Sequence, residues 1–242
     1  MNEIIKSLHS RKSVRVYEKR EIGKSEKEAI LSAALAAPSA GNMCLYTILD
    51  ITDSALKESL SHTCDEQPFI KDAPMVLVFC ADYKRWYDVF CESCDTVRKP
   101  DTGDLFLAQA DALIAAQNAV VAAESLGIGS CYIGDIVENI EEQQRLLNLP
   151  QYVVPAAMLC FGYPTKQQKE RKKPARFNIE DIVHENGYSE DKANRMKDML
   201  KEREQNEDID GWISRFCERK WNSDFSIEMS RSCNEIINIW KK

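Results

Sequence analysis

The sequence lacks any apolar run of about 18 residues, the length that a helix needs to cross a bilayer. Its first stretch also lacks the apolar core of a signal peptide, because Lys6 and His9 interrupt it. An excess of basic residues is absent as well: the formal net charge is −7, whereas a nucleic-acid-binding protein needs a broad basic surface. These absences predict a cytoplasmic protein whose partners include neither a membrane nor a nucleic acid.

Histidine is scarce, with three residues, and the cysteines do not follow the spacing of a metal site. Cys91 and Cys94 form a Cys-x-x-Cys motif, but no second pair lies at zinc-binding spacing. The nine cysteines are an odd number without the spacing of a disulfide framework, so free thiols are the simplest interpretation. A structural zinc or a thioredoxin-like dithiol at Cys91 and Cys94 is the alternative; otherwise no metal site is predicted.

The composition is that of a globular chain, with 44% apolar and 29% charged residues in 242. Apolar periodicity and turn residues predict helices over residues 3–10, 25–37, 54–61, 104–126 and 140–147. Buried strands are predicted over residues 74–81 and 153–161, a further strand over residues 45–51, and a short strand or turn over residues 130–134. The second helix is expected to begin with a capping box of Ser25 and Glu28. Few strands and many helices predict an α+β fold or a mixed α/β sandwich.

The stretch 104–126 is the longest apolar helical segment, and it is rich in alanine. Apolar residues cover nearly all of its faces, so we expect a centrally buried helix. Its small side chains allow close backbone approach. This suits either a core helix or a helix shared across a dimer interface.

The composition changes near Gly187, which predicts a domain of residues 1–187 and an extension of residues 188–242. Residues 192–210 are charged and helical, and the extension then becomes rich in aromatic residues. It contains three of the four tryptophans, Trp212, Trp221 and Trp240. We expect this helical extension to pack on a partner subunit or over a pocket.

The segment 11–15 places Arg11, Lys12 and Arg15 around the hydroxyl of Ser13. Arginine makes fork-shaped charge-assisted hydrogen bonds and lysine supplies a point charge, so the group suits a phosphate monoester. Taken alone, the same residues are more typical of a solvated basic turn.

Three segments in order, 10–17, 36–42 and 127–134, resemble the FMN-dependent nitroreductase superfamily. They correspond to its R-x-S-x-R-x-[FY], A-P-S-x-x-N and G-[IL]-G-[ST]-x-[WY]-x-G motifs, and the match covers roughly residues 1–188. Gln67-Pro68-Phe69, Arg176 and residues 183–186 resemble the branch of oxygen-insensitive nitroreductases and flavin reductases. The resemblance implies a nitroreductase-like mixed α/β sandwich with a central, mostly antiparallel sheet flanked by helices. It also implies an intertwined homodimer with two FMN sites at the interface.

The resemblance further implies roles for individual residues. The FMN phosphate and ribityl chain would be held by Arg11, Lys12, Ser13, Arg15, Arg176 and Lys173 (or Lys172). Ser39 and Asn42 would reach the flavin from the partner subunit, and Gln67 and Phe69 would lie near its isoalloxazine ring. The backbone that passes the flavin is expected at Tyr132, Ile133, Gly134 and Asp135. No catalytic side chain is implied, because the flavin carries the chemistry.

Two parts of the chain depart from the family pattern. Cys44 stands where the family often has Gln, and Leu45 and Tyr46 replace the Pro-Trp that follows. The arginines that bind NADPH in this branch have no secure counterpart, so the preference for NADH or NADPH stays open. The candidates are Arg203, Arg215, Arg219 and Lys220. His184 is expected to be structural.

The function implied by the resemblance is that of an FMN-dependent NAD(P)H oxidoreductase with ping-pong kinetics. Its acceptor would be a small molecule: a nitroaromatic, a quinone or free flavin. One alternative is an FMN-binding sensor or storage protein without turnover. Another is a related flavoenzyme with different chemistry, such as reductive dehalogenation or flavin destruction.

Overall fold

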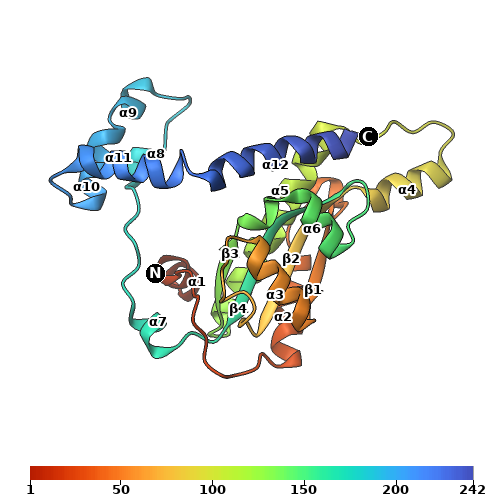
Figure 1. Cartoon of the computed structure of the whole chain (residues 1–242), viewed down its shortest axis with the longest axis horizontal. Coiled ribbons are helices and arrows are strands. Elements are labelled where there is room, and N and C mark those ends of the chain that lie inside the picture. Colours follow the sequence, from red (N-terminus) through yellow and green to blue (C-terminus); the bar gives the residue numbers. More distant parts are fainter. Residues whose placement is uncertain (242) are drawn as a thin grey trace. The chain divides into compact units, whose positions relative to one another are not determined.

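The computed structural model describes residues 1–241 of the chain (Figure 1). It divides into two compact units. The first contains Met1–Arg171 and the returning segment Glu228–Lys242, and the second contains Lys172–Ile227. The position where the composition changes, near residue 187, therefore lies inside the second unit. The chain leaves and re-enters the first unit, a path that composition along the sequence does not reveal.

The first unit is built on a four-stranded sheet in the order β1-β2-β4-β3, with every neighbouring pair antiparallel. The strands are β1 (Tyr46–Ile51), β2 (Met75–Asp82), β3 (Gly129–Ile133) and β4 (Val153–Gly162). The central strands β2 and β4 are buried along their whole length. This confirms the predicted antiparallel sheet, whose central strands are continuous apolar runs because helices cover both of their faces.

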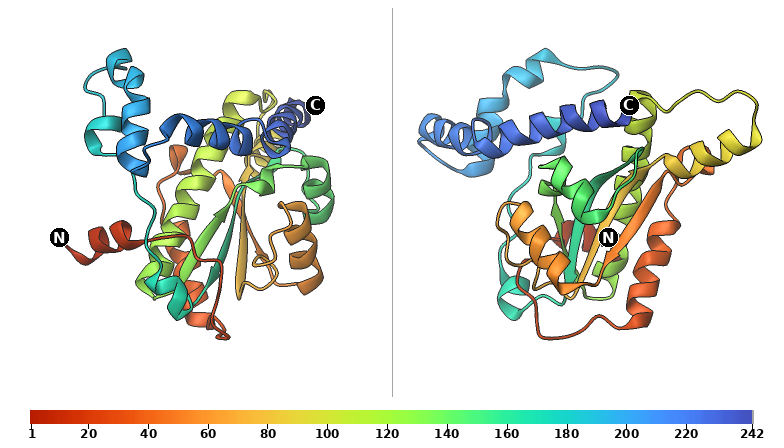
Figure 2. Two further views of the ribbon diagram at one scale, coloured as in Figure 1. Left: turned by 60° about the vertical axis from the view of Figure 1, so that its left-hand side comes forward. Right: turned by 45° about the vertical axis from the view of Figure 1, so that its right-hand side comes forward.

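Helices pack on the two faces of this sheet (Figure 2). Leu77 and Phe79 of β2 contact α2 (Lys24–Leu35) and α5 (Thr102–Ser125) on one face. The alternate residues Val76 and Val78 contact α3 (Ser54–Thr63) and α6 (Ile140–Leu147) on the other. Successive strand residues point to opposite faces, so one strand can serve two apolar layers. The result is the helix–sheet–helix arrangement predicted from the sequence.

Helix α5 differs from the expectation of a centrally buried helix. Its alanine-rich side, including Ala112 and Ala116, is fully buried, whereas Phe106 is 66% exposed and Leu113 and Ile114 are also exposed. Only one side of α5 faces the sheet, so its outer apolar side has no cover in the single chain. By length and composition α5 is apolar enough to cross a membrane. However, its inner face packs in the core as that of a core helix does.

Helix α12 (Asp224–Lys241) ends inside the first unit. Trp240 is 0% exposed, and its ring centroid lies 5.8 Å from that of Tyr152. The Ser232 hydroxyl donates to the Val137 carbonyl at 2.6 Å and accepts from the Ile140 N–H at 3.1 Å. Residues 228–241 of the predicted extension therefore complete the core of their own chain.

The remaining elements of the first unit are α1 (Glu3–Ser10), α4 (Lys84–Ser93), α7 (Lys166–Glu170) and the short helices η1 (Ala40–Asn42) and η2 (Asp135–Val137). The second unit contains α8 (Ile179–Ile182), α9 (Glu190–Asn194), α10 (Met196–Glu204) and α11 (Ile209–Lys220). One predicted boundary is wrong. Helix α2 begins after Gly23, whose N–H donates to Glu26 Oε2 at 2.8 Å, so Ser25 is not the N-cap. Glu26 therefore occupies the N3 position of the capping box that was expected for Glu28.

Candidate functional site

The basic opening segment lies along the edge strand β3. Ser13 forms a parallel bridge with Ser130, and the Val14 N–H donates to the Ser130 carbonyl at 2.9 Å. A Cβ at Gly129 would come within 2.5 Å of the Val14 side chain. The glycine is thus required for the segment to approach the strand so closely. This packing makes the segment 11–15 part of the sheet edge and excludes the interpretation of a loose solvated turn.

The two arginines of this segment have no carboxylate partner among the described residues. An Arg11 Nη2 donor lies 3.4 Å from Ser130 Oγ, while Arg11 Nε is buried and has no hydrogen-bond partner. The Arg15 guanidinium lies 5.7 Å from the Phe69 ring centroid. The chain has 39 acidic and 32 basic residues, so unpaired arginines at one edge stand out from its acidic background. A buried donor without a partner, as at Arg11 Nε, fits an external anion such as a phosphate.

Lys12 takes a different part in the structure. Its ammonium donates to the Lys169 carbonyl at 2.6 Å and also to the Arg171 carbonyl. The Arg171 guanidinium donates in return to the Ser13 carbonyl at 2.6 Å. Lys12 and Arg171 therefore tie the opening segment to the end of α7. In the sequence, residues 166–176 are visible only as a second cluster of basic residues, which does not predict this contact.

The end of β3 carries the peptide that was expected to pass a flavin. Gly134 has an ordinary right-handed φ of −76°, and a Cβ added there would meet no atom of the chain within 4 Å. Neither backbone conformation nor internal packing therefore accounts for the glycine, whereas an open surface at this point allows a ligand to approach the backbone. Four residues separate Ser130 from Gly134, which corresponds to about 13 Å along a strand. The Arg11 guanidinium lies 6.0 Å from the Tyr132 ring centroid, so the arginine cluster borders the same strand that leads to the open glycine.

A loop after α3 joins this edge from the other side. Asp65 and Glu66 have left-handed φ values of 59° and 50°, and the Gln67 side chain donates to the Cys64 carbonyl at 2.8 Å. The turn places Phe69 beside Arg15, as the ring distance shows. A pocket of about 810 Å³ opens here, lined by Arg15, Phe69, Lys57 and neighbouring residues. Burial lowers the pKa of Lys57, whose ammonium donates to the Ala73 carbonyl at 3.0 Å.

The loop with Ser39 and Asn42 lies between α2 and β1. Ser39 Oγ accepts the Cys44 N–H at 2.8 Å. Asp111, which is only 3% exposed, accepts the Ala40 N–H at 3.0 Å and the Leu45 N–H at 3.1 Å. The role of Asp111 was missed in the sequence, although one carboxylate within an alanine-rich apolar helix was a visible signal.

Helix α4 supports the same loop from its first turn. The Arg85 guanidinium donates to the Cys44 carbonyl at 3.0 Å, and Trp86 Nε1 donates to the Met43 carbonyl at 2.6 Å. Asn42 and Cys44 have left-handed φ values of 57° and 50°. The loop is therefore a fixed structure whose backbone groups are bonded within the chain.

The structure does not bring all predicted residues together. It joins Arg11, Ser13, Arg15, Phe69 and the peptide 132–135 around β3. The Ser39 loop leads into β1, at the opposite edge of the four-stranded sheet, about 14 Å away at ordinary strand spacing. Lys173 and Arg176 belong to the second unit, Lys172–Ile227.

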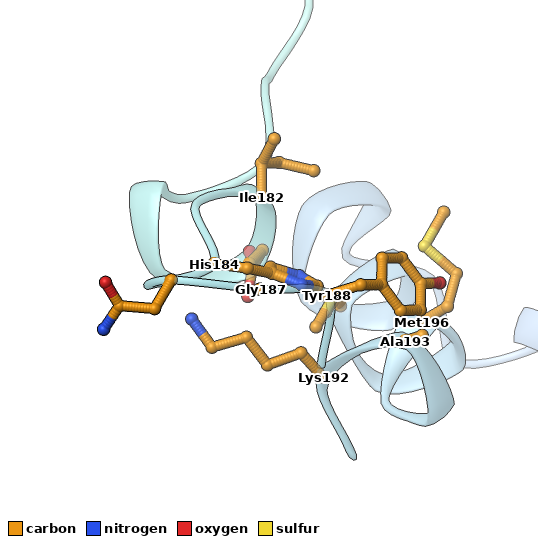
Figure 3. Close-up of a pocket in the computed structure, with 10 residues that line it drawn as sticks. Ile182, His184, Gly187, Tyr188, Lys192, Ala193 and Met196 are labelled. Atoms are coloured by element: carbon orange, nitrogen blue, oxygen red, sulfur yellow. The ribbon is translucent and has the colours of Figure 1, made fainter. Parts of the chain in front are cut away.

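The second unit has a pocket of about 560 Å³ (Figure 3). His184 and Tyr188 line it with ring centroids 5.3 Å apart, and His184 Nδ1 accepts the Ser189 N–H at 2.9 Å. The Lys192 ammonium donates to the Val183 carbonyl at 2.8 Å. These groups bond to one another, which agrees with the structural role predicted for His184. Arg203 lies 4.3 Å from the Phe177 ring and pairs with Glu204, so its charge is also used within the unit.

The described residues contain no group of three His, Cys, Asp or Glu side chains that could hold a metal ion. Cys91 and Cys94 are exposed free thiols at the end of α4. The zinc alternative for this motif therefore has no further ligand in the described part of the chain.

The antiparallel sheet between two helical layers, with an unpartnered arginine donor beside an edge strand, defines a mixed α/β protein with a candidate anion-binding site. The chain belongs to the nitroreductase family, whose family model matches residues 8–163. It is 36% identical over 188 residues to the oxygen-insensitive NADPH nitroreductase of Salmonella typhimurium, covering 78% of this chain and 75% of that protein. It is 35% identical over 191 residues to the FMN reductase [NAD(P)H] of Bacillus subtilis, with 78% and 75% coverage.

A solved structure extends the similarity over nearly the whole chain. The NADPH:FMN oxidoreductase of Vibrio harveyi, solved in complex with NAD+, superposes with a TM-score of 0.80 and 26% identity. The superposition covers 98% of each chain. The fold similarity therefore includes the segment beyond residue 188, where the sequence motifs end.

Proposed function

We propose that this chain is an FMN-dependent NAD(P)H oxidoreductase that reduces a small-molecule acceptor by a ping-pong mechanism. The observation that carries the proposal is the pair of arginines without carboxylate partners among the described residues, Arg11 and Arg15, beside the strand that leads to the open backbone at Gly134. The names of the relatives, an NADPH nitroreductase and an FMN reductase, support it. Nitroaromatics, quinones and free flavin are the candidate acceptors, and a cytoplasmic location is part of the same prediction.

The residues present fit the cofactor. The buried Arg11 Nε lacks a partner and can donate to a phosphate oxygen, and Arg15 supplies a second guanidinium to the same edge. Ser13, Lys173 and Arg176 complete the proposed phosphate and ribityl contacts. Lys12, whose ammonium already binds two carbonyls, would act mainly by holding the segment in place.

Bound FMN would supply the redox chemistry, by accepting a hydride from NAD(P)H and passing its reducing equivalents to the acceptor. The residues of the chain would bind and orient this group. Gly134 would leave space for the ring beside the peptide 132–135. Phe69 lines a pocket together with Arg15, and Gln67 precedes it in the loop after α3. No side chain is assigned as an acid or base of the reaction.

We further propose a homodimer in which Ser39 and Asn42 of one subunit complete the site of the other. The Ser39 loop and β3 lie at opposite edges of the sheet, so one chain does not bring them together. The exposed apolar side of α5, with Phe106 and Leu113, and the exposed Ile4 of α1 offer a surface for the contact. Light scattering of the FMN-loaded protein tests this proposal, and a monomer would contradict it.

The alternative of an FMN-binding protein without turnover rested partly on an aromatic tail over the flavin. Trp240 lies in the core of its own chain, and this removes one support for the alternative. The absorbance spectrum after dialysis tests cofactor binding, and we expect flavin peaks to persist. Stopped-flow mixing with NADPH and NADH then separates the two functions, because only the enzyme should lose its flavin absorbance. A stable oxidised spectrum with both donors would favour the binding protein.

Steady-state kinetics test the order of the reaction. In a ping-pong mechanism the oxidised nicotinamide leaves before the acceptor binds, so double-reciprocal plots at several acceptor concentrations should be parallel. Intersecting lines would contradict this order. The ratio of the bleaching rates with NADPH and NADH gives the donor preference, for which Arg219 and Lys220 are exposed candidates on α11.

A further inference from the structure

Glu138 is a buried carboxylate with one oxygen that has no hydrogen-bond partner among the described residues. It lies directly after η2, is 6% exposed, and its Oε1 atom is buried without a hydrogen-bond partner. A buried polar group without a partner is costly and needs an explanation. Its ionised form would be costlier still, since a carboxylate loses the solvation that water provides.

The surroundings of Glu138 increase that cost. The carboxylates of Asp135, Asp65 and Glu228 act on it, and all three disfavour its charged form. Burial, followed by these three charges, raises the pKa of Glu138 to about 7. Glu138 is therefore an acid that exchanges its proton near neutrality, unlike an ordinary surface glutamate.

Nearby cations do not compensate Glu138. Arg231 of α12 donates to Glu228 Oε2 at 2.8 Å and to Glu141 Oε1 of α6 at 2.8 Å, so its charge is shared by two other carboxylates. Around Glu138 the titratable groups are Asp135 on η2, Cys64 and Asp65 at the end of α3, Glu228 and Arg231 on α12, and Glu141 on α6. Among the described residues no three such side chains could hold a metal ion, so a cation site does not explain the cluster.

The position of Glu138 connects it to both segments that were assigned to the flavin ring. Asp135 belongs to the peptide 132–135, three residues before Glu138. Asp65 belongs to the left-handed turn that sets Gln67, whose N–H donates to the Ser61 carbonyl at 2.9 Å. A negative charge on Glu138 would repel both aspartates and push these two segments apart.

We propose that Glu138 is a positioning residue of the flavin site, where its protonated carboxyl lets the turn of Asp65 and the peptide of Asp135 remain close together. This inference rests on the proposed FMN function. When Glu138 loses its proton, its negative charge adds to those of Asp135, Asp65 and Glu228. The two segments then move apart, and the affinity for FMN falls with the loss of that proton.

The raised pKa of Glu138 determines how the stability of the fold changes with pH. The native state retains a proton that the unfolded chain loses near pH 4.5, so the stabilising contribution is complete below that value and disappears as the pH rises through about 7. Because the proposed site needs the two segments close together, FMN should bind the protonated form more tightly, and its affinity should weaken from slightly acid to slightly basic solution. Glu138→Gln preserves the shape and neutrality of the acid and should remove this dependence.

The experiment measures the FMN dissociation constant by flavin fluorescence between about pH 5.5 and pH 8.5 for the full chain and for two variants. We expect the constant of the natural chain to rise by about tenfold over this range and that of Glu138→Gln to stay level. The control is Glu142→Gln on α6, an exposed glutamate paired with Arg145, which should follow the natural chain. A second readout is the unfolding temperature without FMN, which should favour Glu138→Gln only at the basic end.

Three results would overturn the proposal in distinguishable ways. An equal rise in the natural chain and in Glu138→Gln would show that another group titrates. A level profile in the control Glu142→Gln would show that the effect is not specific to Glu138. Absence of FMN binding by the natural chain at every pH would reject the proposed function itself, and this inference with it.

Discussion

The two loop regions proposed to meet at one flavin are built in opposite ways. Along β3, the Nε donor of Arg11 and the surface at Gly134 are left open by the chain. In the Ser39 loop, the backbone N–H groups of Ala40, Cys44 and Leu45 are all bonded internally. A site that binds an anion needs spare donors, whereas a loop that presents side chains to another subunit needs a fixed backbone. Each region is therefore suited to a different part of one interface.

The largest effect is expected from removing the spare donors. Arg11→Ala and Arg15→Ala should each weaken FMN binding by roughly 10- to 100-fold, because each loses charge-assisted hydrogen bonds to the phosphate. Equilibrium dialysis against FMN measures the change. Arg145→Ala is the matched control, since this exposed arginine pairs only with Glu142 on α6. If both variants fold normally and bind FMN with unchanged affinity, these two arginines do not bind the phosphate.

The second prediction concerns the stability of the Ser39 loop, which depends on the buried carboxylate of Asp111. Asp111→Ala leaves the N–H groups of Ala40 and Leu45 without acceptors, which should lower the free energy of unfolding by about 2–4 kcal/mol. Asp111→Asn keeps one acceptor oxygen and should lose less. Urea denaturation measures both variants. If Asp111→Ala is as stable as the natural chain, the loop does not depend on this carboxylate.

The sequence predicted one of these regions better than the other. The apolar runs defined every strand to within one residue at most ends, and the motif at residues 11–15 located the cationic edge. Asp111 was not found because its partners are backbone groups more than 60 residues away, which leave no pattern in the sequence. The same reason hides the docking of Trp240 against Tyr152, since an aromatic tail has the same composition whether it covers a pocket or completes a core.

The open surface at β3 is tested by adding one methyl group. Gly134→Ala should leave the stability of the FMN-free chain nearly unchanged, because the new Cβ meets nothing within 4 Å. FMN affinity should fall by about tenfold if the ring approaches this backbone closely. Gly129→Ala is the matched control with the opposite outcome, as its Cβ collides with Val14 and should destabilise the fold. Equal FMN affinity in Gly134→Ala and the natural chain would show that the ligand does not pass this peptide.

The smallest effect on FMN affinity is expected at Lys12. This lysine lies beside Arg11 in the sequence, but its ammonium is bonded within the chain, as the backbone groups of the Ser39 loop are. Its ammonium binds the Lys169 and Arg171 carbonyls, so Lys12→Ala should cost about 1 kcal/mol of stability. FMN affinity should fall much less than in Arg11→Ala, since the lysine holds the segment without being free to bind phosphate. Parallel urea denaturation and dialysis separate these quantities. A large loss of FMN with unchanged stability would mean that the lysine leaves the carbonyls to bind the phosphate, and Lys12 would then join Arg11 and Arg15 as a proposed ligand of FMN.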